Sequence, residues 1–296
     1  MTEIKFSDIF HNIEKFKLIT KSIVQGFITG NHKSPLYGFS VEFSEHRPYI
    51  SGDPVDSIDW KLFARTDKYY IKRYEDETNV RVYIVLDHSK SMQFSSEKSN
   101  SDKLNYGKLV TATLSYLALK QKDAVGLFTI NNKITSYLPA KSKANWIDQI
   151  LNNLNVTDTV GETSLSECLH EIAEKIQKRN MIIIISDFLD ETKELNSALR
   201  HLKYNMNDVI LININDQKEL SLDYKSLIEM HDLETGEVLN INTSEIRNDY
   251  IKFLQEHYKS IEDATYQLKY DYIDFQTNQD FTKVLSSFLH RRNNMQ

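Results

Sequence analysis

The chain has 296 residues and a formal charge of −6, from 36 lysines and arginines against 42 aspartates and glutamates. This length indicates one large domain or two smaller ones, and the mild acidity argues against nucleic-acid binding as the main role. Only 8 glycines and 4 prolines are present, which excludes collagen-like and low-complexity chains. The single cysteine excludes an internal disulfide and disfavours a cysteine-based zinc site.

The sequence shows neither a membrane span nor an export signal. Its longest clean apolar run, residues 181–185, is far shorter than the roughly 20 residues that a bilayer requires. The first residues lack the basic start and apolar stretch of a signal peptide. We therefore expect a cytoplasmic protein in a reducing compartment, with no membrane span.

The first 79 residues are expected to form a small N-terminal module of helix, short strands and loops. Apolar residues at helical spacing predict a helix over residues 4–27, which a polar turn ends. Short strand-like segments follow around residues 39–43 and 69–74. Between them, residues 54–65 could form a short helix, with Asp53 as its cap.

From residue 80 to the end, apolar runs alternate with amphipathic helices. The runs cover residues 82–86, 125–130, 182–185 and 209–214, with a weaker one at 266–270. Apolar stripes at helical spacing cover residues 165–176, 246–261 and 281–289. Near-continuous apolar strands are typical of a parallel sheet buried on both faces. We therefore assign residues 80–296 to an α/β domain with a doubly wound, mostly parallel, Rossmann-like sheet.

Two segments interrupt this alternation and are predicted to form antiparallel hairpins. Residues 133–138 follow the second apolar run across Asn131 and Asn132, which indicates a hairpin at an edge of the sheet. Residues 227–230 and 238–241 flank a turn that contains Gly236, which indicates a second hairpin.

Polar side chains gather where strands of the predicted sheet end. Asp87, Ser89 and Ser91 follow the first buried strand as Asp-x-Ser-x-Ser, and Asp187 follows the run at 182–185. Thr163 precedes the helix that starts near residue 164. Open α/β sheets bind ligands at the carboxyl ends of strands, where the strand order reverses. If the first and fourth strands are neighbours there, these five residues converge.

Three hydroxyls and two carboxylates suit a hard divalent cation. Mg²⁺ prefers octahedral oxygen coordination, keeps several waters and needs only one or two carboxylates. We therefore predict a Mg²⁺ site, for which Mn²⁺ and Ca²⁺ are also compatible, with one coordination position open to a carboxylate of another molecule. Alone, the Asp-x-Ser-x-Ser pattern is a weak signal and is better explained as a polar turn and helix cap. The order of all three segments favours the metal site.

On these segments, residues 80–290 resemble a von Willebrand factor A domain, and the five oxygen-bearing residues match its metal-ion-dependent adhesion site. The chain further resembles a bacterial family known as domain of unknown function 58. Its most specific matches are Gly52-Asp53-Pro54, Ile58-Asp59-Trp60, Ala64-Arg65 and Glu77. Two departures are Pro54, where the family usually has an acidic residue, and Glu162, where many members have glycine.

This resemblance implies a non-enzymatic, Mg²⁺-dependent protein-interaction module. Members of the family are often encoded beside AAA+ ATPases of the MoxR type. The implied role is therefore an adaptor that works with such an ATPase in complex assembly or metalloenzyme maturation. The implied partner is a protein that donates a carboxylate to the metal.

The alternative function is a metal-dependent hydrolase or phosphatase that uses the same site. Asp87 could accept a phosphoryl group, but the general acid expected two residues later is replaced by Ser89. Cys168 lies on the apolar stripe of its helix, which indicates a buried, inert thiol. His88 is not expected in a hard-oxygen shell and is predicted to point outward. We therefore expect no enzyme activity.

Overall fold

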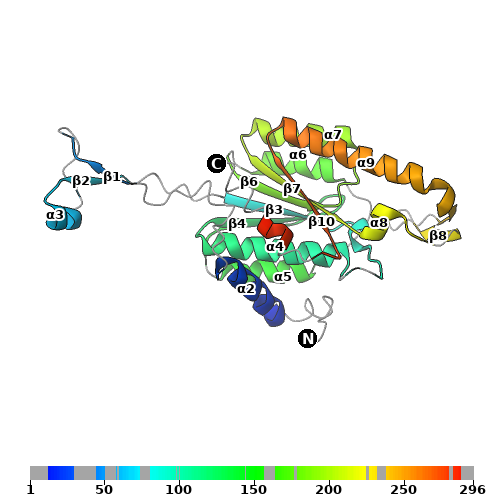
Figure 1. Ribbon diagram of the computed structural model, residues 1–296, viewed down its shortest axis with the longest axis horizontal. Coiled ribbons are helices and arrows are strands. Elements are labelled where there is room, and N and C mark those ends of the chain that lie inside the picture. The colour runs from blue at the N-terminus through cyan, green and yellow to red at the C-terminus, as the bar shows by residue number, and fades with distance from the viewer. Residues whose placement is uncertain are drawn as a thin grey trace.

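The structure is a computed structural model. It describes residues 13–29, 45–50, 58, 60–73, 81–97, 99, 101–143, 145–156, 164–176, 179–224, 227–231, 238–279 and 283–287. At its centre lies a six-stranded sheet that has helices on both faces (Figure 1).

The order of the strands in this sheet is β10-β7-β6-β3-β4-β5. The strands are β3 (Arg81–Asp87), β4 (Ala124–Ile130), β5 (Ile134–Lys141), β6 (Met181–Ser186), β7 (Asp208–Asn215) and β10 (Asp271–Gln276). All neighbours pair in parallel except β4 and β5, which form an antiparallel hairpin at one edge. The predicted doubly wound, mostly parallel α/β sheet and its edge hairpin are thus confirmed.

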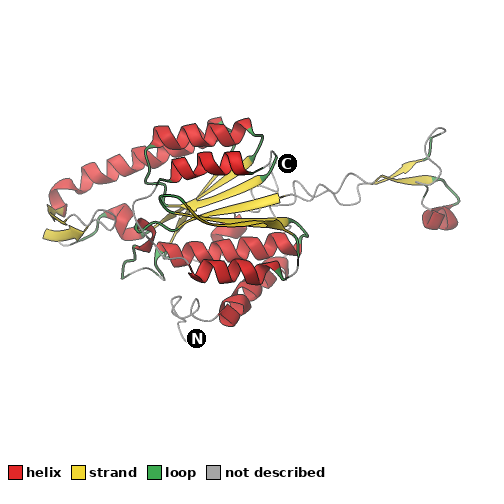
Figure 2. Ribbon diagram, turned by 180° about the vertical axis from the view of Figure 1, so that it is seen from behind, coloured by secondary structure: helices red, strands yellow, loops and turns green. Residues whose placement is uncertain are grey.

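Both faces of the central strands are buried, as their apolar runs predict. In β6, Ile183 and Ile185 belong to the core on one side of the sheet, and Ile182 and Ile184 to the core on the other. The first side is covered by α2 (Ile13–Thr29), α4 (Lys103–Lys120) and α5 (Trp146–Val156). The second is covered by α6 (Leu165–Lys175), α7 (Thr192–Tyr204) and α9 (Thr243–Gln267). Figure 2 shows the resulting three layers from behind.

Helix α2 overlaps the helix that the sequence predicts over residues 4–27 and ends two residues later, at Thr29. It begins at Ile13, and residues 4–12 lie outside the described residues. Phe16 and Val24 are fully buried and join the core beneath α4 and α5. Helix α2 therefore packs on α4 and α5 of the α/β domain, while the proposed boundary at residue 80 stays a prediction.

The rest of the N-terminal segment contains a small α+β unit, as predicted. Strands β1 (Glu45–Pro48) and β2 (Tyr70–Arg73) pair antiparallel, and α3 (Trp60–Thr66) lies between them in sequence. The rings of Phe63 and Tyr69 stack with centroids 4.5 Å apart. The strand predicted at 69–74 is therefore present, whereas the one at 39–43 lies outside the described residues.

The short helix predicted over residues 54–65 begins later than expected. Ile58 forms an isolated strand bridge, and α3 begins only at Trp60. Asp53, the expected cap, and the other residues from 51 to 57 lie outside the described residues.

The C-terminal third contains one confirmed and one wrong prediction. Strands β8 (Leu227–His231) and β9 (Val238–Asn242) pair antiparallel as the predicted second hairpin. The weak strand predicted at 266–270 is wrong, because α9 continues to Gln267 and Tyr266 is 83% exposed on its outer face. A left-handed turn at Lys269, with φ of 56°, then leads into β10. Across the described residues, no helix is long and apolar enough to cross a membrane.

Gly126 on β4 allows Tyr83 of β3 to pack across the neighbouring strand. A Cβ atom at Gly126 would lie 2.5 Å from the Tyr83 ring and 3.0 Å from the backbone oxygen of Leu138. We predict that Gly126→Ala lowers the free energy of unfolding by about 1–3 kcal/mol, because the buried ring must shift. Urea denaturation measures this change. Lys133→Ala, at an exposed position of the same hairpin, is the control and should change stability by no more than about 0.5 kcal/mol. Equal stability of the two variants would contradict the prediction.

Candidate metal centre

The strand order reverses between β3 and β6. From β3 the chain first adds β4 and β5 on one side and then crosses to β6 on the other side. In this parallel pair, Leu86 lies opposite Ile185. The carboxyl ends of the two strands therefore lie side by side, at the switch point where open α/β sheets bind ligands. The first and fourth strands of this domain, β3 and β6, are thus neighbours, as predicted.

Asp87 is the last residue of β3, and its side chain is held by two hydrogen bonds. Its Oδ1 accepts from the backbone N–H of Ser89 at 2.8 Å, a local turn typical of aspartate. Its Oδ2 accepts from the Ser186 hydroxyl at 2.7 Å, which ties it to the end of β6. The residue is only 1% exposed. Asp87 is therefore a buried carboxylate in a fixed orientation.

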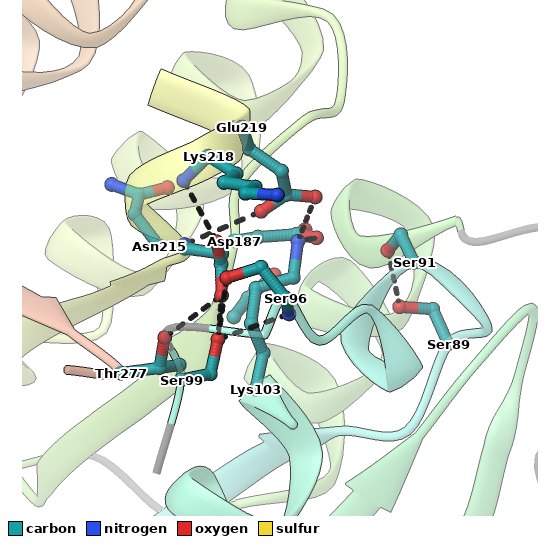
Figure 3. Close-up of polar contacts among 12 residues, drawn as sticks. Ser89, Ser91, Ser96, Ser99, Lys103, Asp187, Asn215, Lys218, Glu219 and Thr277 are labelled. Carbon is teal, nitrogen blue, oxygen red and sulfur yellow. Dashed lines mark hydrogen bonds and ion pairs between the residues drawn. The ribbon is translucent and has the colours of Figure 1, made fainter. Parts of the chain in front are cut away.

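The hydroxyls of Ser89 and Ser91 lie side by side, with their Oγ atoms 2.9 Å apart (Figure 3). Ser91 begins a 3₁₀ turn, Ser91–Gln93, which the fully buried Met92 anchors in the core. Two adjacent oxygens in an octahedral Mg²⁺ shell, each about 2.1 Å from the ion, are separated by about 3 Å. The two hydroxyls are hydrogen-bonded to each other, and the 2.9 Å between their oxygens also matches the spacing of neighbouring ligands.

Asp187 follows β6 directly and is buried beside a lysine. Its Oδ2 accepts from Lys103 Nζ at 2.9 Å, and the same ammonium donates to Glu219 Oε1 at 2.8 Å (Figure 3). The backbone oxygen of Asp187 accepts from the Tyr258 hydroxyl of α9 at 3.3 Å. The side chain and the backbone of this residue are thus both fixed by other elements.

The loop after β7 supports Glu219. Helix α8 (Gln217–Ser221) begins with a capping box, in which Asp216 accepts from the Lys218 N–H and Glu219 accepts from the Asp216 N–H. Asp216 also accepts from the hydroxyls of Ser99 and Thr277. The segments that follow β3, β7 and β10 at this edge of the sheet are therefore joined by one network of hydrogen bonds.

The electrostatics of the site favour a cation. Burial, and then the nearby charge of Asp187, raise the pKa of Asp87 to about 7. Burial alone would lower the pKa of Lys103, but the charges of Asp187 and Glu219 outweigh it and raise that pKa above its usual value. The charge of Asp187 thus disfavours the ionised form of Asp87, and a bound divalent cation would offset that effect.

The residues present fit a hard divalent cation. Asp87, Ser89, Ser91 and Asp187 supply carboxylate and hydroxyl oxygens at one edge of the sheet, whereas Thr163 lies outside the described residues. Within the described residues, no group of three or more His, Cys, Asp or Glu side chains gathers as a metal cluster. An ion here would therefore depend on hydroxyls and water, which suits Mg²⁺ and not Zn²⁺.

For two residues beside this site, His88 and Cys168, one prediction from the sequence is wrong and the other is confirmed. His88 was expected to point outward, which is wrong: it is fully buried, and burial followed by the charge of Lys108 lowers its pKa to about 3. Cys168 is buried as expected, with its thiol donating to the Asn131 backbone oxygen at 3.7 Å. Burial raises the pKa of this thiol to about 12.

Lys103, Glu219 and the role of Ser186 were not predicted from the sequence. A signal for Lys103 was present, because a lysine at the first position of a helix opposes the helix dipole. Glu219 stands three residues after Asp216, the spacing of a capping box. Neither pattern predicts that the Lys103 and Glu219 side chains are in contact.

The fold and this edge define an α/β protein with a candidate cation site at the switch point of its sheet. The family described as "Protein of unknown function DUF58" matches residues 45–260, and the chain belongs to this family. The family resemblance inferred from the sequence is thereby confirmed.

Uncharacterized proteins of Mycobacterium tuberculosis and Mycobacterium bovis are similar to this chain. Each is 21% identical over 253 residues, which cover 83% of this chain and 77% of the relative. Their descriptions assign no activity.

Among solved structures, BatB from Bacteroides thetaiotaomicron is similar with a TM-score of 0.48 and 15% identity, covering 73% of this chain and 99% of that one. The SpRpn10 VWA domain is similar with a TM-score of 0.42 and 12% identity, covering 72% and 95%. Because both scores are below 0.5, the fold assignment depends on the sheet topology described above.

Ser186 holds Asp87 and also accepts from the backbone N–H of Phe188 at 3.0 Å. We predict that Ser186→Ala lowers the free energy of unfolding by about 1–3 kcal/mol in metal-free buffer, because a buried carboxylate loses its partner. Chemical denaturation measures the change. Ser197→Ala on the exposed face of α7 is the matched control, and an equally small loss in both variants would contradict this account.

Proposed function

We propose that this chain is a Mg²⁺-dependent protein-interaction module that acts by binding and not by turnover. One observation carries the proposal. At the switch point, the buried Asp87 and Asp187 stand at the carboxyl ends of the paired strands β3 and β6, and the hydroxyls of Ser89 and Ser91 are hydrogen-bonded to each other with their oxygens 2.9 Å apart. These are the oxygen types and the spacing that Mg²⁺ prefers.

The residues that would hold the ion are Asp87, Ser89, Ser91 and Asp187, with Thr163 as a further ligand from outside the described residues. A bound Mg²⁺ would offer a coordination position to a carboxylate of a protein partner. The chain's own part is to keep its ligands in place. The Ser89 N–H and the Ser186 hydroxyl orient Asp87, and Lys103 orients Asp187.

Several features argue for binding and against a hydrolase. Ser89 stands where a phosphatase of the aspartyl-phosphate type would need its general acid. His88 is buried, and its low pKa leaves it uncharged at neutral pH, so it does not provide an imidazolium to act as general acid toward a leaving group. The Cys168 thiol, with a pKa of about 12, is no nucleophile at that pH.

The partner proposed is an AAA+ ATPase of the MoxR type, with this chain as its adaptor in complex assembly or metalloenzyme maturation. This part of the proposal rests on what the sequence resemblance implies, that members of the family are often encoded beside such ATPases, and the chain belongs to that family. The partner's contribution would be an exposed acidic side chain.

The metal site is tested by titrating Mg²⁺ into the full chain by isothermal calorimetry. We expect Asp87→Asn to weaken Mg²⁺ binding at least about tenfold, because a charged ligand becomes neutral. Asp123→Asn is the matched control, since Asp123 is buried to the same 1% but precedes β4 at the opposite edge of the sheet. Equal affinities for the wild type and Asp87→Asn would refute the metal site.

The interaction is tested by pull-down of a MoxR-type ATPase with the full chain, in Mg²⁺ and in EDTA. We expect capture in Mg²⁺ that is lost in EDTA and lost in Asp87→Asn. Capture that survives both changes would show that the metal site does not bind this partner. Hydrolysis of p-nitrophenyl phosphate by the wild type, abolished in Asp87→Asn, would instead support the phosphatase.

A further inference from the structure

Lys103 is a buried cation next to the candidate metal ligands. It is the first residue of α4 and only 1% exposed. Its ammonium reaches across to the loops after β6 and β7, where it donates to Asp187 and Glu219 (Figure 3). A lysine this deeply buried is rare unless it is paired.

The position of Lys103 is unfavourable on local grounds. A positive charge in the first turn of a helix opposes the helix dipole, and burial removes the hydration of the ammonium. Asp102, the residue before it, already caps α4 by accepting from the Asn105 N–H at 2.6 Å. Lys103 therefore contributes nothing to starting the helix, and its carboxylate partners are what hold it in place.

Carboxyl groups outnumber ammonium groups among the residues that contact Lys103 or end β3 and β6. Asp87, Asp187 and Glu219 carry three carboxyl groups, and Lys103 supplies one positive charge to two of them. Lys103 engages one oxygen of Asp187, Oδ2, and a carboxylate has a second oxygen that can serve another cation. The same side chain can thus face both the ammonium and a metal shell.

We propose that Lys103 is the resident counter-ion of this site, which shares Asp187 with the divalent cation and thereby sets the affinity of the site for metal. The inference rests on the proposed Mg²⁺ site. Glu219 has the opposite effect, since it draws part of the ammonium's charge away from Asp187. Its own position is fixed by the capping box of α8.

This arrangement predicts opposite effects for two substitutions. Lys103→Met keeps the length of the side chain and removes its charge, so the potential at Asp187 becomes more negative and Mg²⁺ binds more tightly. Glu219→Gln leaves the whole ammonium charge to Asp187, so Mg²⁺ binds more weakly. If Lys103 served only to hold the loops in place, Lys103→Met would instead weaken Mg²⁺ binding, because ligands that are less well ordered bind the metal less tightly.

The experiment measures Mg²⁺ affinity by calorimetry and melting temperature in EDTA and in saturating Mg²⁺, using the full chain. For Lys103→Met we expect binding tighter by on the order of tenfold and a lower melting temperature in EDTA, with a larger rise on adding Mg²⁺ than in the wild type. For Glu219→Gln we expect weaker binding. Lys175→Met is the matched control, because it removes a lysine from an exposed ion pair with Glu171 and should leave the affinity unchanged.

The outcomes separate this inference from the proposed function. Mg²⁺ binding by the wild type with equal or weaker binding by Lys103→Met overturns the inference and leaves the metal site standing. No Mg²⁺ binding by any variant overturns both. Binding by Lys103→Met alone would support the inference and refute a metal-dependent role for the wild type. If Lys103→Met fails to fold, unchanged or tighter binding by Glu219→Gln overturns the inference.

Discussion

The burial of like charges at one edge of the sheet is the constraint on which the site depends. Asp87 and Asp187 end neighbouring strands and are almost fully buried. Buried charges are costly unless they are paired and hydrogen-bonded. Hydrogen bonds offset this cost. The Ser89 N–H and the Ser186 hydroxyl donate to Asp87, and the Lys103 ammonium donates to Asp187. These partners come from α4, from the loop after β3 and from the last residue of β6, so three separate elements stabilise the two buried carboxyl groups.

The sheet itself explains why the charges meet. Five strands pair in parallel and present their carboxyl ends at one edge, and the crossover to β6 places the ends of β3 and β6 together. The apolar runs that form these strands are buried from both sides by α-helices. A one-residue slip of β6 would exchange the two faces of its side chains. The packing of the core thus fixes the position of Asp187 relative to Asp87.

Local patterns predicted most of the sheet and the positions of Asp87 and Asp187 at the ends of neighbouring strands. Apolar runs identify buried strands, and the strand-end rule places Asp87 and Asp187 at one edge. The strand predicted at 266–270 failed because aromatic residues occur both on exposed helix faces and in strands, and α9 is longer than its apolar stripe. His88 was misplaced because its neighbours in sequence are polar, while its burial comes from residues far away in the chain.

The Lys103 cluster could not be predicted by the same means. Lys103 lies 84 positions from Asp187 and 116 from Glu219 in sequence. A lysine near a helix start is ordinarily a solvated side chain, and only the fold shows that this one turns inward. Its significance depends on which loops adjoin the first turn of α4, and that is a property of the complete tertiary structure.

The pairing of β3 with β6 also has a consequence for the order of folding events. Asp87 and Ser186 are 99 positions apart, so their contact closes a long loop, and contacts of that kind form slowly. Hairpins such as β4–β5 involve neighbouring residues and need no such closure. The two aspartates therefore come together after much of the local structure has formed. A divalent ion would recognise the completed domain and would give little help to the chain while it is still assembling.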